Sequence, residues 1–585
     1  MAYSNESSQF TNFNTEIGNY PIKVVALGGL DEMGKNCYVI EVDNDAFVIE
    51  AGIKYPNAQI PGVDVIIPDF DYLRNISRRV KAIIITHGHD DQYGALPYLL
   101  NVVRAPIYAT ETTIAIIQAT LGKKFRKLEQ ATFVPVKPSD SIDISGHHFE
   151  FFQTTHSVSD SFGFALKTAF GNIIYTSDFM SDYSPLKGFQ FDLPKVARLS
   201  ETDKTFLLMT ESESADKPGI ASPNHKITDH IKSYFEESSG KIFVSIYSQN
   251  FYNIQEVINL AIKYKKHICI PNPEIATFFN KMAAIGKLVI PDNLKVSATS
   301  VPSLPAKDTL ILVCDSGEKL FNYCKEICYG NVPGLKVDVK DLWINAAPSV
   351  PGTEIVATDA ADTIFRTDCH VLTLSRKVLA SMHAQQEDLK MMISLFRPKY
   401  YMPVKGEFRL LMANAKLAID LGIGLNHFNT FVYDNGMALA FDKTGAPVRK
   451  AITVKNGDVM VDGSSVGEVK ETAIEERTQM ADGGVVLIGL AISLSQKRIV
   501  SNPDIQMRGF LYLKDSEPIL NQVNNILTST AIQLMTNTER KVSLVDMEKR
   551  ISDKISKFLL KETDKEPMIV THLLNVDDLT PIDPK

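Results

Sequence analysis

One short segment restricts this chain more than any other: Thr86-His87-Gly88-His89-Asp90-Asp91-Gln92. It follows the apolar run 80–85, which is typical of a buried strand. Open α/β sheets place their active sites at such strand ends. Only 12 of the 585 residues are histidine, so two of them spaced by one residue and followed by an aspartate are not expected by chance. The pattern predicts a site for a divalent metal ion.

Two more ligand-type residues follow predicted strands. The strand predicted at 149–153 leads into His156, and the strand predicted at 172–176 leads into Asp178. The two histidines of the first segment and His156 would hold one tetrahedral metal with an open water position, and Asp178 would bridge to a second metal. Imidazole and carboxylate ligands suit Zn²⁺ or Mn²⁺. The alternative, that these histidines only satisfy hydrogen bonds of their loops, leaves four ligand-type residues at strand ends unexplained.

The composition is that of a multidomain globular protein. With 585 residues, 44% of them hydrophobic, the chain has material for several cores, because single cores stop growing near about 250–300 residues. The net charge of −8 gives no general attraction to nucleic acid, so an RNA contact would use a local basic groove. The polar segment 1–20 has no apolar signal region. Since no run of about 18 apolar residues occurs either, we expect a cytoplasmic protein without a membrane contact.

Three smaller patterns each allow two interpretations. Cys324 and Cys328 lack a second cysteine pair, which favours one helix face over a zinc site. The stripe 544–558 has apolar residues at helical spacing, and we expect it to pack on its own domain, with a partner-binding helix as the alternative. The basic run 122–127 is interpreted as a solvated helix face, with phosphate contact as the alternative.

The order of predicted elements divides the chain into domains. A helix is predicted at 91–103, directly after the first ligand segment. Alternating helices and short apolar strands predict an inserted parallel-sheet domain. The predicted parts are a tail at 1–20, a first domain in two parts at 21–213 and 369–443, the inserted domain at 214–368, a linker at 444–470 and a C-terminal α/β domain at 471–585.

The chain resembles members of the ribonuclease J family, which are nucleases of the metallo-β-lactamase type with an inserted β-CASP domain. The resemblance runs from Lys23 to about Val576. It implies a metallo-β-lactamase αββα sandwich, a parallel-sheet β-CASP insertion and a C-terminal α/β domain that supports oligomers. The motifs that carry it include Ala26-Leu27-Gly28-Gly29, Thr86-His87-Gly88-His89, His156-Ser157-Val158-Ser159-Asp160-Ser161, Ser381-Met382-His383-Ala384-Gln385, Pro403-Val404-Lys405-Gly406-Glu407 and Arg508-Gly509-Phe510.

The resemblance assigns roles to individual residues. The first-metal ligands match His87, His89, His156 and Asp178, and a second-metal ligand with a catalytic role matches Asp91. By the same match, Ser381 and His383 contact the scissile phosphate and assist the leaving group. Ala384 and Ser248 complete the expected phosphate-binding set.

Several positions depart from the family pattern. Gln92 and Lys405 stand where the family has the two histidines of the second metal site. Met382 replaces a glycine of the phosphate motif, and Ser177 replaces the glycine before Asp178. In the β-CASP part, Asn253 stands where the family usually has a phosphate-facing arginine, and a Gly-Ser-Gln-Gly segment is reduced to Asp315-Ser316-Gly317.

The two changes at the second metal site have direct physical consequences. Gln92 offers only a neutral carbonyl oxygen, and the ammonium of Lys405 has no lone pair to give. An ammonium also repels a cation, by roughly 4 kcal/mol per charge product at about 4 Å and an effective dielectric of about 20. We therefore expect one occupied metal site, with Zn²⁺ first and Mn²⁺ as the alternative. Lys405 is expected to pair with Asp91, Asp178 or both.

The resemblance implies a ribonuclease J-like RNA-processing protein. It would be a 5′-to-3′ exoribonuclease, with endonuclease action as a further option, in mRNA decay and rRNA maturation, and the degraded second site predicts weakened activity. The alternative is an inactive paralogue, of the degenerate second type, that binds RNA or supports an active ribonuclease J. The expected binding partner is RNA. The chain is expected to form a homodimer, a homotetramer or a hetero-oligomer with an active paralogue. A small-molecule hydrolase is disfavoured, because it leaves the insertion and the Ser381-Met382-His383 motif unexplained.

Overall fold

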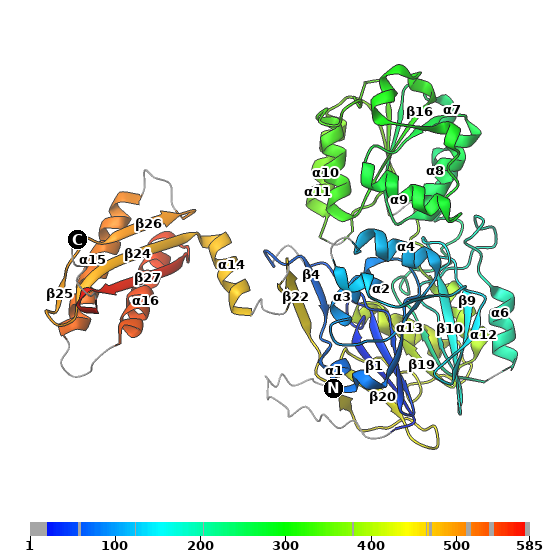
Figure 1. The fold of residues 1–585 in the computed structure, drawn as a ribbon, viewed down its shortest axis with the longest axis horizontal. Helices are drawn as coiled ribbons and strands as arrows, with labels where there is room; N and C mark the ends of the chain where they lie inside the picture. The colour runs from blue at the N-terminus through cyan, green and yellow to red at the C-terminus, as the bar shows by residue number, and fades with distance from the viewer. Residues whose placement is uncertain are drawn as a thin grey trace. The chain divides into compact units, whose positions relative to one another are not determined.

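The computed structural model describes residues 20–578, except 57–59, 123–124, 203, 351, 377–378, 464, 467–470, 511–515 and 537–542. The chain divides into two compact units (Figure 1). One comprises the residues up to Tyr55 together with Val65–Val459, and the other comprises Pro56–Asp64 and the residues from Met460 onward. No helix among the described residues is both long and apolar enough to cross a membrane.

The first unit is built on two stacked β-sheets. One sheet has, in order, β21 (Ile452–Thr453), β20 (Met437–Phe441), β1 (Ile22–Gly28), β2 (Cys37–Val42), β3 (Asp45–Ile49), β5 (Val80–Ile84), β6 (Ile107–Ala109) and β7 (Phe133–Pro135). The other has β19 (Tyr400–Pro403), β12 (Thr205–Thr210), β11 (Gly171–Tyr175), β10 (Phe162–Thr168), β9 (His147–Gln153) and β8 (Ser141–Ile144). A short strand, β4, covers Val65–Pro68.

Strand β9 shows how the layers pack, because both of its faces are buried. Phe149 points between the sheets and meets the ring of Phe47 edge-on, with 5.0 Å between ring centroids. Phe152 points the other way, toward Phe396 of a covering helix, at 6.2 Å. Alternate residues of a strand face opposite sides, so one strand serves two cores. The predicted αββα sandwich is confirmed.

Helices cover the outer faces of the two sheets. The helices on the second sheet are α6 (Leu193–Thr202), α12 (Gln386–Phe396) and α13 (Phe408–Asp420). The first part of the domain also contains α1 (Asp71–Ile76), α2 (Asp90–Tyr93), α3 (Leu96–Leu99), α4 (Glu111–Thr120) and α5 (Arg126–Glu129).

The single helix predicted at 91–103 is wrong. The chain forms α2 and α3 instead, with a break at Gly94 and Ala95. Pro97 lies in the first turn of α3, where its missing N–H is tolerated, but it cannot donate to a continuous helix. The break follows the ligand segment directly, so α2 is a single turn.

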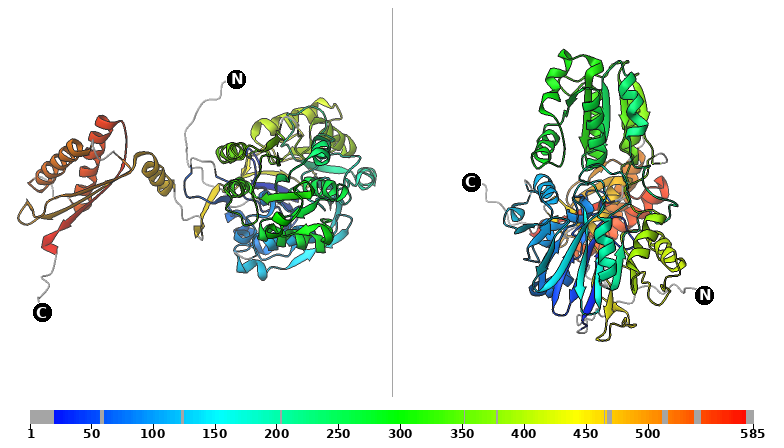
Figure 2. Two further views of the ribbon diagram at one scale, coloured as in Figure 1. Left: turned by 90° about the horizontal axis from the view of Figure 1, so that it is seen from above. Right: turned by 90° about the vertical axis from the view of Figure 1, so that its right-hand side faces the viewer.

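The inserted domain has a fully parallel sheet. Its order is β15 (Lys295–Val296), β14 (His267–Cys269), β16 (Thr309–Asp315), β13 (Ile242–Tyr247), β17 (Leu342–Asn345) and β18 (His370–Thr373). Helices flank the green strands in the right view of Figure 2; they are α7 (Thr228–Glu237), α8 (Phe251–Lys263), α9 (Pro273–Ala284), α10 (Gly317–Cys328) and α11 (Glu354–Phe365). β18 pairs with β17, so this sheet extends past the predicted limit at residue 368. Cys324 and Cys328 both belong to α10, as the helix-face interpretation predicts.

The C-terminal unit has a small sheet with two long helices on one side (Figure 2, left view). Its central strand β24 (Val485–Ser493) pairs with β27 (Met568–Asn575) in parallel and with β25 (Arg498–Ile499) and β26 (Asp504–Arg508) in antiparallel fashion. The helices are α14 (Glu471–Gly483), α15 (Ser516–Thr536) and α16 (Leu544–Thr563). Met547, Ile551 and Ile555 of α16 are buried in this unit's own core, as predicted.

The segment 444–470 is not wholly the linker that the sequence predicts. Strand β21 lies within it and extends the first sheet by pairing with β20. Two more short strands, β22 (Asp458–Asp462) and β23 (Ser465–Val466), pair with each other.

The only tryptophan of the chain gives a direct test of the β-CASP core. Trp343 is fully buried and stacks on Phe243, with 4.9 Å between ring centroids and an interplanar angle of 4°. We expect Phe243→Ala to lower the free energy of unfolding of this domain by about 3–5 kcal/mol, because it leaves a cavity beside the indole. Denaturant titration followed by tryptophan emission measures this change.

The matched control is Phe365→Ala on α11, since the Phe365 side chain is 57% exposed. It should change the unfolding free energy by no more than about 0.5 kcal/mol. Equal effects of the two substitutions would contradict the packing described here.

Candidate metal centre

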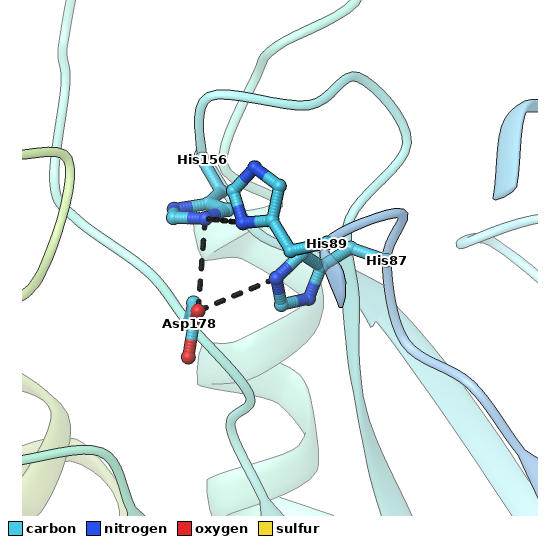
Figure 3. A group of neighbouring side chains, drawn as sticks. All are labelled: His87, His89, His156 and Asp178. Carbon is cyan, nitrogen blue, oxygen red and sulfur yellow. Dashed lines mark hydrogen bonds and ion pairs between the residues drawn. The ribbon is translucent and has the colours of Figure 1, made fainter. Parts of the chain in front are cut away.

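Four ligand-type side chains from three loops gather at one point (Figure 3). His87 and His89 lie between β5 and α2, His156 follows β9, and Asp178 follows β11. Their nearest ligand atoms all lie within 4.8 Å of one another. The strand ends that the sequence indicated therefore meet at one edge of the sandwich.

The atoms that converge are three nitrogens and one oxygen. His87 Nε2 lies 3.3 Å from Asp178 Oδ2, and His156 Nε2 lies 3.6 Å from the same oxygen. His156 Nε2 is also 3.1 Å from His89 Nδ1. Figure 3 draws these approaches as dashed lines. Three histidine nitrogens and a carboxylate oxygen that converge in this way are typical of a site that binds a metal cation.

The ring of His87 is oriented by two hydroxyl groups on its other side. Its Nδ1 lies 3.1 Å from Thr86 Oγ1 and 3.3 Å from Ser177 Oγ. Ser177 is the residue that replaces the family's glycine, and its φ is 56°, a left-handed conformation that favours glycine. The serine hydroxyl contacts His87 and Thr86, so this side chain contributes bonds that glycine lacks.

The other two rings are oriented in the same manner. His89 Nε2 lies 3.0 Å from Ser157 Oγ, and His156 Nδ1 lies 2.8 Å from the carbonyl oxygen of Met382. Such partners fix the tautomer of a ligand histidine, since the outward nitrogen carries the proton. Met382 stands where the family motif has a glycine. The bond to His156 uses the backbone carbonyl of Met382, which any residue at this position would provide.

The donor set fits a divalent metal. Burial lowers the pKa of His89 to about 3 and the pKa of His156 well below its ordinary value, so both rings are neutral and keep a lone pair. His87 Nε2 and Asp178 Oδ1 are buried and have no hydrogen-bond partner in the structure. Buried polar atoms are rarely left unpaired, and a metal at this point would satisfy them.

An ammonium group lies at the position where the family resemblance implies a ligand of the second metal. Lys405 is buried; its Nζ contacts Asp178 Oδ2 and lies 3.1 Å from Asp91 Oδ2. A third carboxylate, that of Glu213, lies 3.9 Å away. Burial opposes the charged form, but Asp178 and Asp91 outweigh it and hold the pKa of Lys405 well above its usual value. The prediction that Lys405 pairs with Asp91, Asp178 or both is confirmed, and the pairing is with both.

The backbone conformation of Lys405 also indicates that its ion pairs hold it in place. Its φ is 54°, in the left-handed region, directly before Gly406. A non-glycine residue costs about 1–2 kcal/mol there, and such outliers persist where surrounding contacts hold them. The ion pairs with the aspartates supply those contacts.

Gln92 does not restore a metal ligand. It is buried, and its Nε2 donates to Asp91 Oδ2 at 3.3 Å, while its Oε1 has no hydrogen-bond partner. Asn36 Nδ2 donates to the same Asp91 oxygen at 3.0 Å. One carboxylate oxygen thus receives an ammonium and two amide groups. Around Lys405 and Gln92, the residues present do not fit a second divalent cation.

His383 lies beside this cluster between two glutamates. Its Nδ1 is 2.6 Å from Glu211 Oε2, and its Nε2 is 3.3 Å from Glu213 Oε2. Burial opposes protonation, but Glu213 and Glu211 outweigh it and raise the pKa of His383 to about 9. The sequence reasoning missed both glutamates. Glu211 directly follows the buried strand β12 and Glu213 lies two residues later, so a place after a strand end was the one signal that the sequence offered.

The other predicted phosphate-binding residues are placed as follows. Ser381 Oγ lies 3.1 Å from Ser214 Oγ, and the amide of Ala384 donates to Glu211 Oε1 at 3.1 Å. Ser248 is buried at the end of β13, in the inserted domain. Their contacts with RNA stay predictions. Of the basic run 122–127, Lys123 and Lys124 lie outside the described residues.

Asn253, which replaces a phosphate-facing arginine of the family, points into the protein. Its Nδ2 donates to the carbonyl oxygen of His225 at 3.1 Å and to Glu256 Oε2 at 2.7 Å. The side chain is buried and fully engaged within the fold. This position therefore supports the inserted domain and offers no positive charge to a phosphate.

Family models match the chain in four consecutive parts. They are described as the metallo-beta-lactamase superfamily (30–205), the ribonuclease J beta-CASP domain (239–364), the Zn-dependent metallo-hydrolase RNA specificity domain (373–430) and the ribonuclease J C-terminal domain (472–576). The order of these parts is that of the fold described above. The chain belongs to the ribonuclease J family.

Relatives of nearly equal length agree with this assignment. Ribonuclease J 2 of Staphylococcus epidermidis is 28% identical over 552 residues, which cover 94% of this chain and 98% of the relative. Ribonuclease J 2 of Staphylococcus aureus strain MRSA252 is 29% identical over 553 residues, with the same coverage. A solved protein of unknown function from Enterococcus faecalis V583 has a TM-score of 0.49 and 14% identity over 72% of this chain and 100% of its own, too distant to add to the assignment.

Membership of the ribonuclease J family confirms three predictions, each as a property of the family. The chain is a ribonuclease J-like RNA-processing protein, its enzyme class is that of a metal-dependent ribonuclease, and its architecture implies a metal and RNA binding. Lys405 stands at the position where the resemblance implies a histidine of the second metal site.

Removing that lysine should destabilise the protein. Lys405→Met leaves Asp91 and Asp178 without their buried cation, and we expect the free energy of unfolding in a chelating buffer to fall by about 3–5 kcal/mol. Adding Zn²⁺ or Mn²⁺ should raise the melting temperature of this variant more than that of the wild type, because a metal replaces the lost charge. Calorimetry with and without metal measures both effects.

The control is Lys416→Met, which changes an exposed lysine of α13. Its melting temperature should match the wild type in both buffers. If Lys405→Met behaves like this control, the ion pairs described here do not contribute to stability.

Proposed function

We propose that this protein processes RNA with a single divalent metal and with weakened hydrolysis. The observation that carries the proposal is the Lys405 ammonium, buried between Asp91 and Asp178. A two-metal nuclease stabilises both the attacking and the leaving oxygen of the phosphodiester. A fixed ammonium attracts a phosphate oxygen but cannot coordinate a water, so only part of that stabilisation remains.

Formal charges support one metal. Two aspartates and two glutamates, described above, contribute four negative charges, and Lys405 with the protonated His383 contributes two positive charges. One divalent cation at the three histidines would balance the remainder. A second cation would have to displace Lys405 from its carboxylates.

Three imidazoles and one carboxylate favour Zn²⁺, with Mn²⁺ as the alternative. When bound, the metal supplies Lewis-acid polarisation of a water or a phosphate oxygen. His383 holds a proton at Nε2, on the side of Glu213, from which it would assist the leaving oxygen. Ser381 would bind the phosphate beside it. Asp91 has a reduced role, because its Oδ2 is engaged by Lys405, Gln92 and Asn36.

The proposed substrate is RNA, cleaved from the 5′ end, with internal cleavage as a further option, in mRNA decay and rRNA maturation. The second candidate function is that of an inactive subunit that binds RNA or supports an active ribonuclease J. The same lysine favours it, because loss of the second metal lowers catalytic power without removing the β-CASP and C-terminal domains.

Elemental analysis of purified protein beside cleavage of a 5′-monophosphorylated RNA tests the proposal. We expect one metal per chain and slow cleavage in the wild type. The double variant Lys405→His/Gln92→His should bind a second metal and cleave at least about 100-fold faster, since a lost metal contributes several kcal/mol of transition-state stabilisation.

The variant His156→Ala serves as the control, because it removes a ligand of the remaining metal and should abolish both binding and cleavage. Absence of cleavage in the wild type, with gain in the double variant, would establish the inactive subunit instead. Two metals and rapid cleavage in the wild type would overturn both candidates.

Association through the C-terminal unit is part of the proposal. Leu487 and Val570 are cross-strand partners, 40% and 42% exposed, and Leu574 on β27 is 44% exposed. Their neighbours along β24, such as Val486 and Ile488, are buried under the helices, so these three side chains share the opposite face of the sheet. An apolar face of this kind suits a homodimer, a homotetramer or a hetero-oligomer with an active paralogue.

Val570→Glu should shift the sedimentation coefficient of the purified protein toward the monomer, because a charge on this face opposes its burial. Val545→Glu is the control, since Val545 is 72% exposed on α16 and should leave the coefficient unchanged. A wild type that is already monomeric would show that the face does not join copies of this chain.

A further inference from the structure

Two residues at the start of helix α8, in the β-CASP domain, contact the three segments that carry the metal ligands. One loop holds His87 and His89, the second holds His156, and the third holds Asp178. The contacts come from two residues, Gln249 just before the helix and Tyr252 in its first turn. A helix of the inserted domain therefore bears directly on the metal centre.

Tyr252 bonds to two of these loops at once. Its backbone N–H donates to the carbonyl oxygen of Ser157 at 3.0 Å, and its hydroxyl donates to Asp182 Oδ2 at 3.0 Å. The first N–H groups of a helix have no partner within the helix, so the bond to Ser157 satisfies one of them. The tyrosine ring is fully buried and meets Phe189 edge-on, with 5.0 Å between centroids.

Gln249 reaches the remaining loop. Its Nε2 donates to Asp90 Oδ1 at 3.1 Å and to the hydroxyl oxygen of Tyr93 at 3.3 Å. Asp90 lies between His89 and Asp91 in the sequence and begins α2. The glutamine thus holds the single-turn helix that follows the first two ligands.

Ser157 connects the backbone contact of Tyr252 to a metal ligand. Its hydroxyl lies 3.0 Å from His89 Nε2, the nitrogen that points away from Asp178 in Figure 3. His87 has two hydroxyl partners on its outer side, and His156 has a backbone carbonyl. Ser157 is the residue that both orients a ligand ring and accepts a hydrogen bond from the β-CASP domain.

We propose that Ser157 is a positioning residue for the metal ligand His89, and that the first turn of α8 couples the placement of the β-CASP domain to metal binding. The inference rests on the proposed function in one respect, namely that the three histidines hold a metal. Docking of α8 holds the three loops in the ligating arrangement, so it strengthens metal binding. By thermodynamic linkage, bound metal strengthens the docking of α8 to the same degree.

Competition between the protein and a chromogenic chelator for Zn²⁺ tests the positioning role. Ser157→Ala should weaken Zn²⁺ binding by about 10- to 100-fold, the range found for partners of ligand histidines. Ser157→Thr keeps the hydroxyl and should restore most of the affinity. Tyr252→Phe removes the bond to Asp182 and should weaken Zn²⁺ binding by about 2- to 10-fold, which corresponds to one hydrogen bond.

Tyr264→Phe is the matched control, because Tyr264 lies at the other end of α8 and its hydroxyl donates to the exposed Glu236, at 3.4 Å. Its Zn²⁺ affinity should equal that of the wild type. Should Ser157→Ala fail to fold, Tyr252→Phe and Gln249→Ala still decide the coupling, since neither changes the loops that carry the ligands.

Hydrogen exchange measures the reverse direction of the coupling. Amide exchange in the first turn of α8 should slow when Zn²⁺ is added to the wild-type protein, and the slowing should be smaller in Tyr252→Phe. Amides of α10, on the other face of the same domain, serve as the internal reference and should not respond.

The outcomes separate this inference from the proposed function. A wild type that binds no Zn²⁺ would overturn the proposed function and the coupling together. A wild type that binds Zn²⁺, with unchanged affinity in Ser157→Ala and Tyr252→Phe, would overturn the coupling alone. Unchanged exchange in α8 on addition of Zn²⁺ would also overturn it.

Discussion

The ion pairs of Lys405 with Asp91 and Asp178 are the constraint around which the site is arranged. The carboxylates of Asp178, which is buried, and of Asp91, which is 28% exposed, repel each other unless a cation lies between them. The family resemblance implies metal-binding histidines at this point, and this chain has the ammonium of Lys405 there. The substitution keeps the scaffold stable, because the charge is replaced, but it removes a ligand position and with it part of the expected chemistry.

The rest of the architecture serves to bring that cluster together. The ligand loops come from strands of both sheets, and the aromatic layer between the sheets, with Phe47 against Phe149, sets how those strand ends face each other. The β-CASP domain adds a second support, because Tyr252 and Gln249 bond to the loops from outside. Hydrogen bonds therefore join the metal-ligand loops to the inserted domain within the first unit.

The local features of this assembly follow from patterns in the chain. Strand ends located His156 and Asp178, and helical spacing located the buried stripe of α16. Of two wrong predictions about elements, one has a local cause, Pro97, and the other has a nonlocal cause, strand pairing. The helix predicted at 91–103 breaks before Pro97, and β18 joins the inserted sheet beyond the expected limit, because its pairing partner β17 is almost 30 positions earlier. Glu211 and Glu213 were missed although they follow a buried strand, since carboxylates after a strand are common and only their contact with His383 sets them apart.

The sequence by itself determined the chemistry of this protein: the ligand types, their places at strand ends, the family resemblance and the loss of two histidines at Gln92 and Lys405. It also indicated that the ammonium of Lys405 would form ion pairs with nearby carboxylates, because the charge of a side chain is set by its residue type. Only the tertiary structure decided which carboxylates it meets and that Ser157 joins His89 to the β-CASP domain. Those contacts link residues far apart in the chain, and their distances depend on how two sheets and an inserted domain pack, which no local pattern encodes.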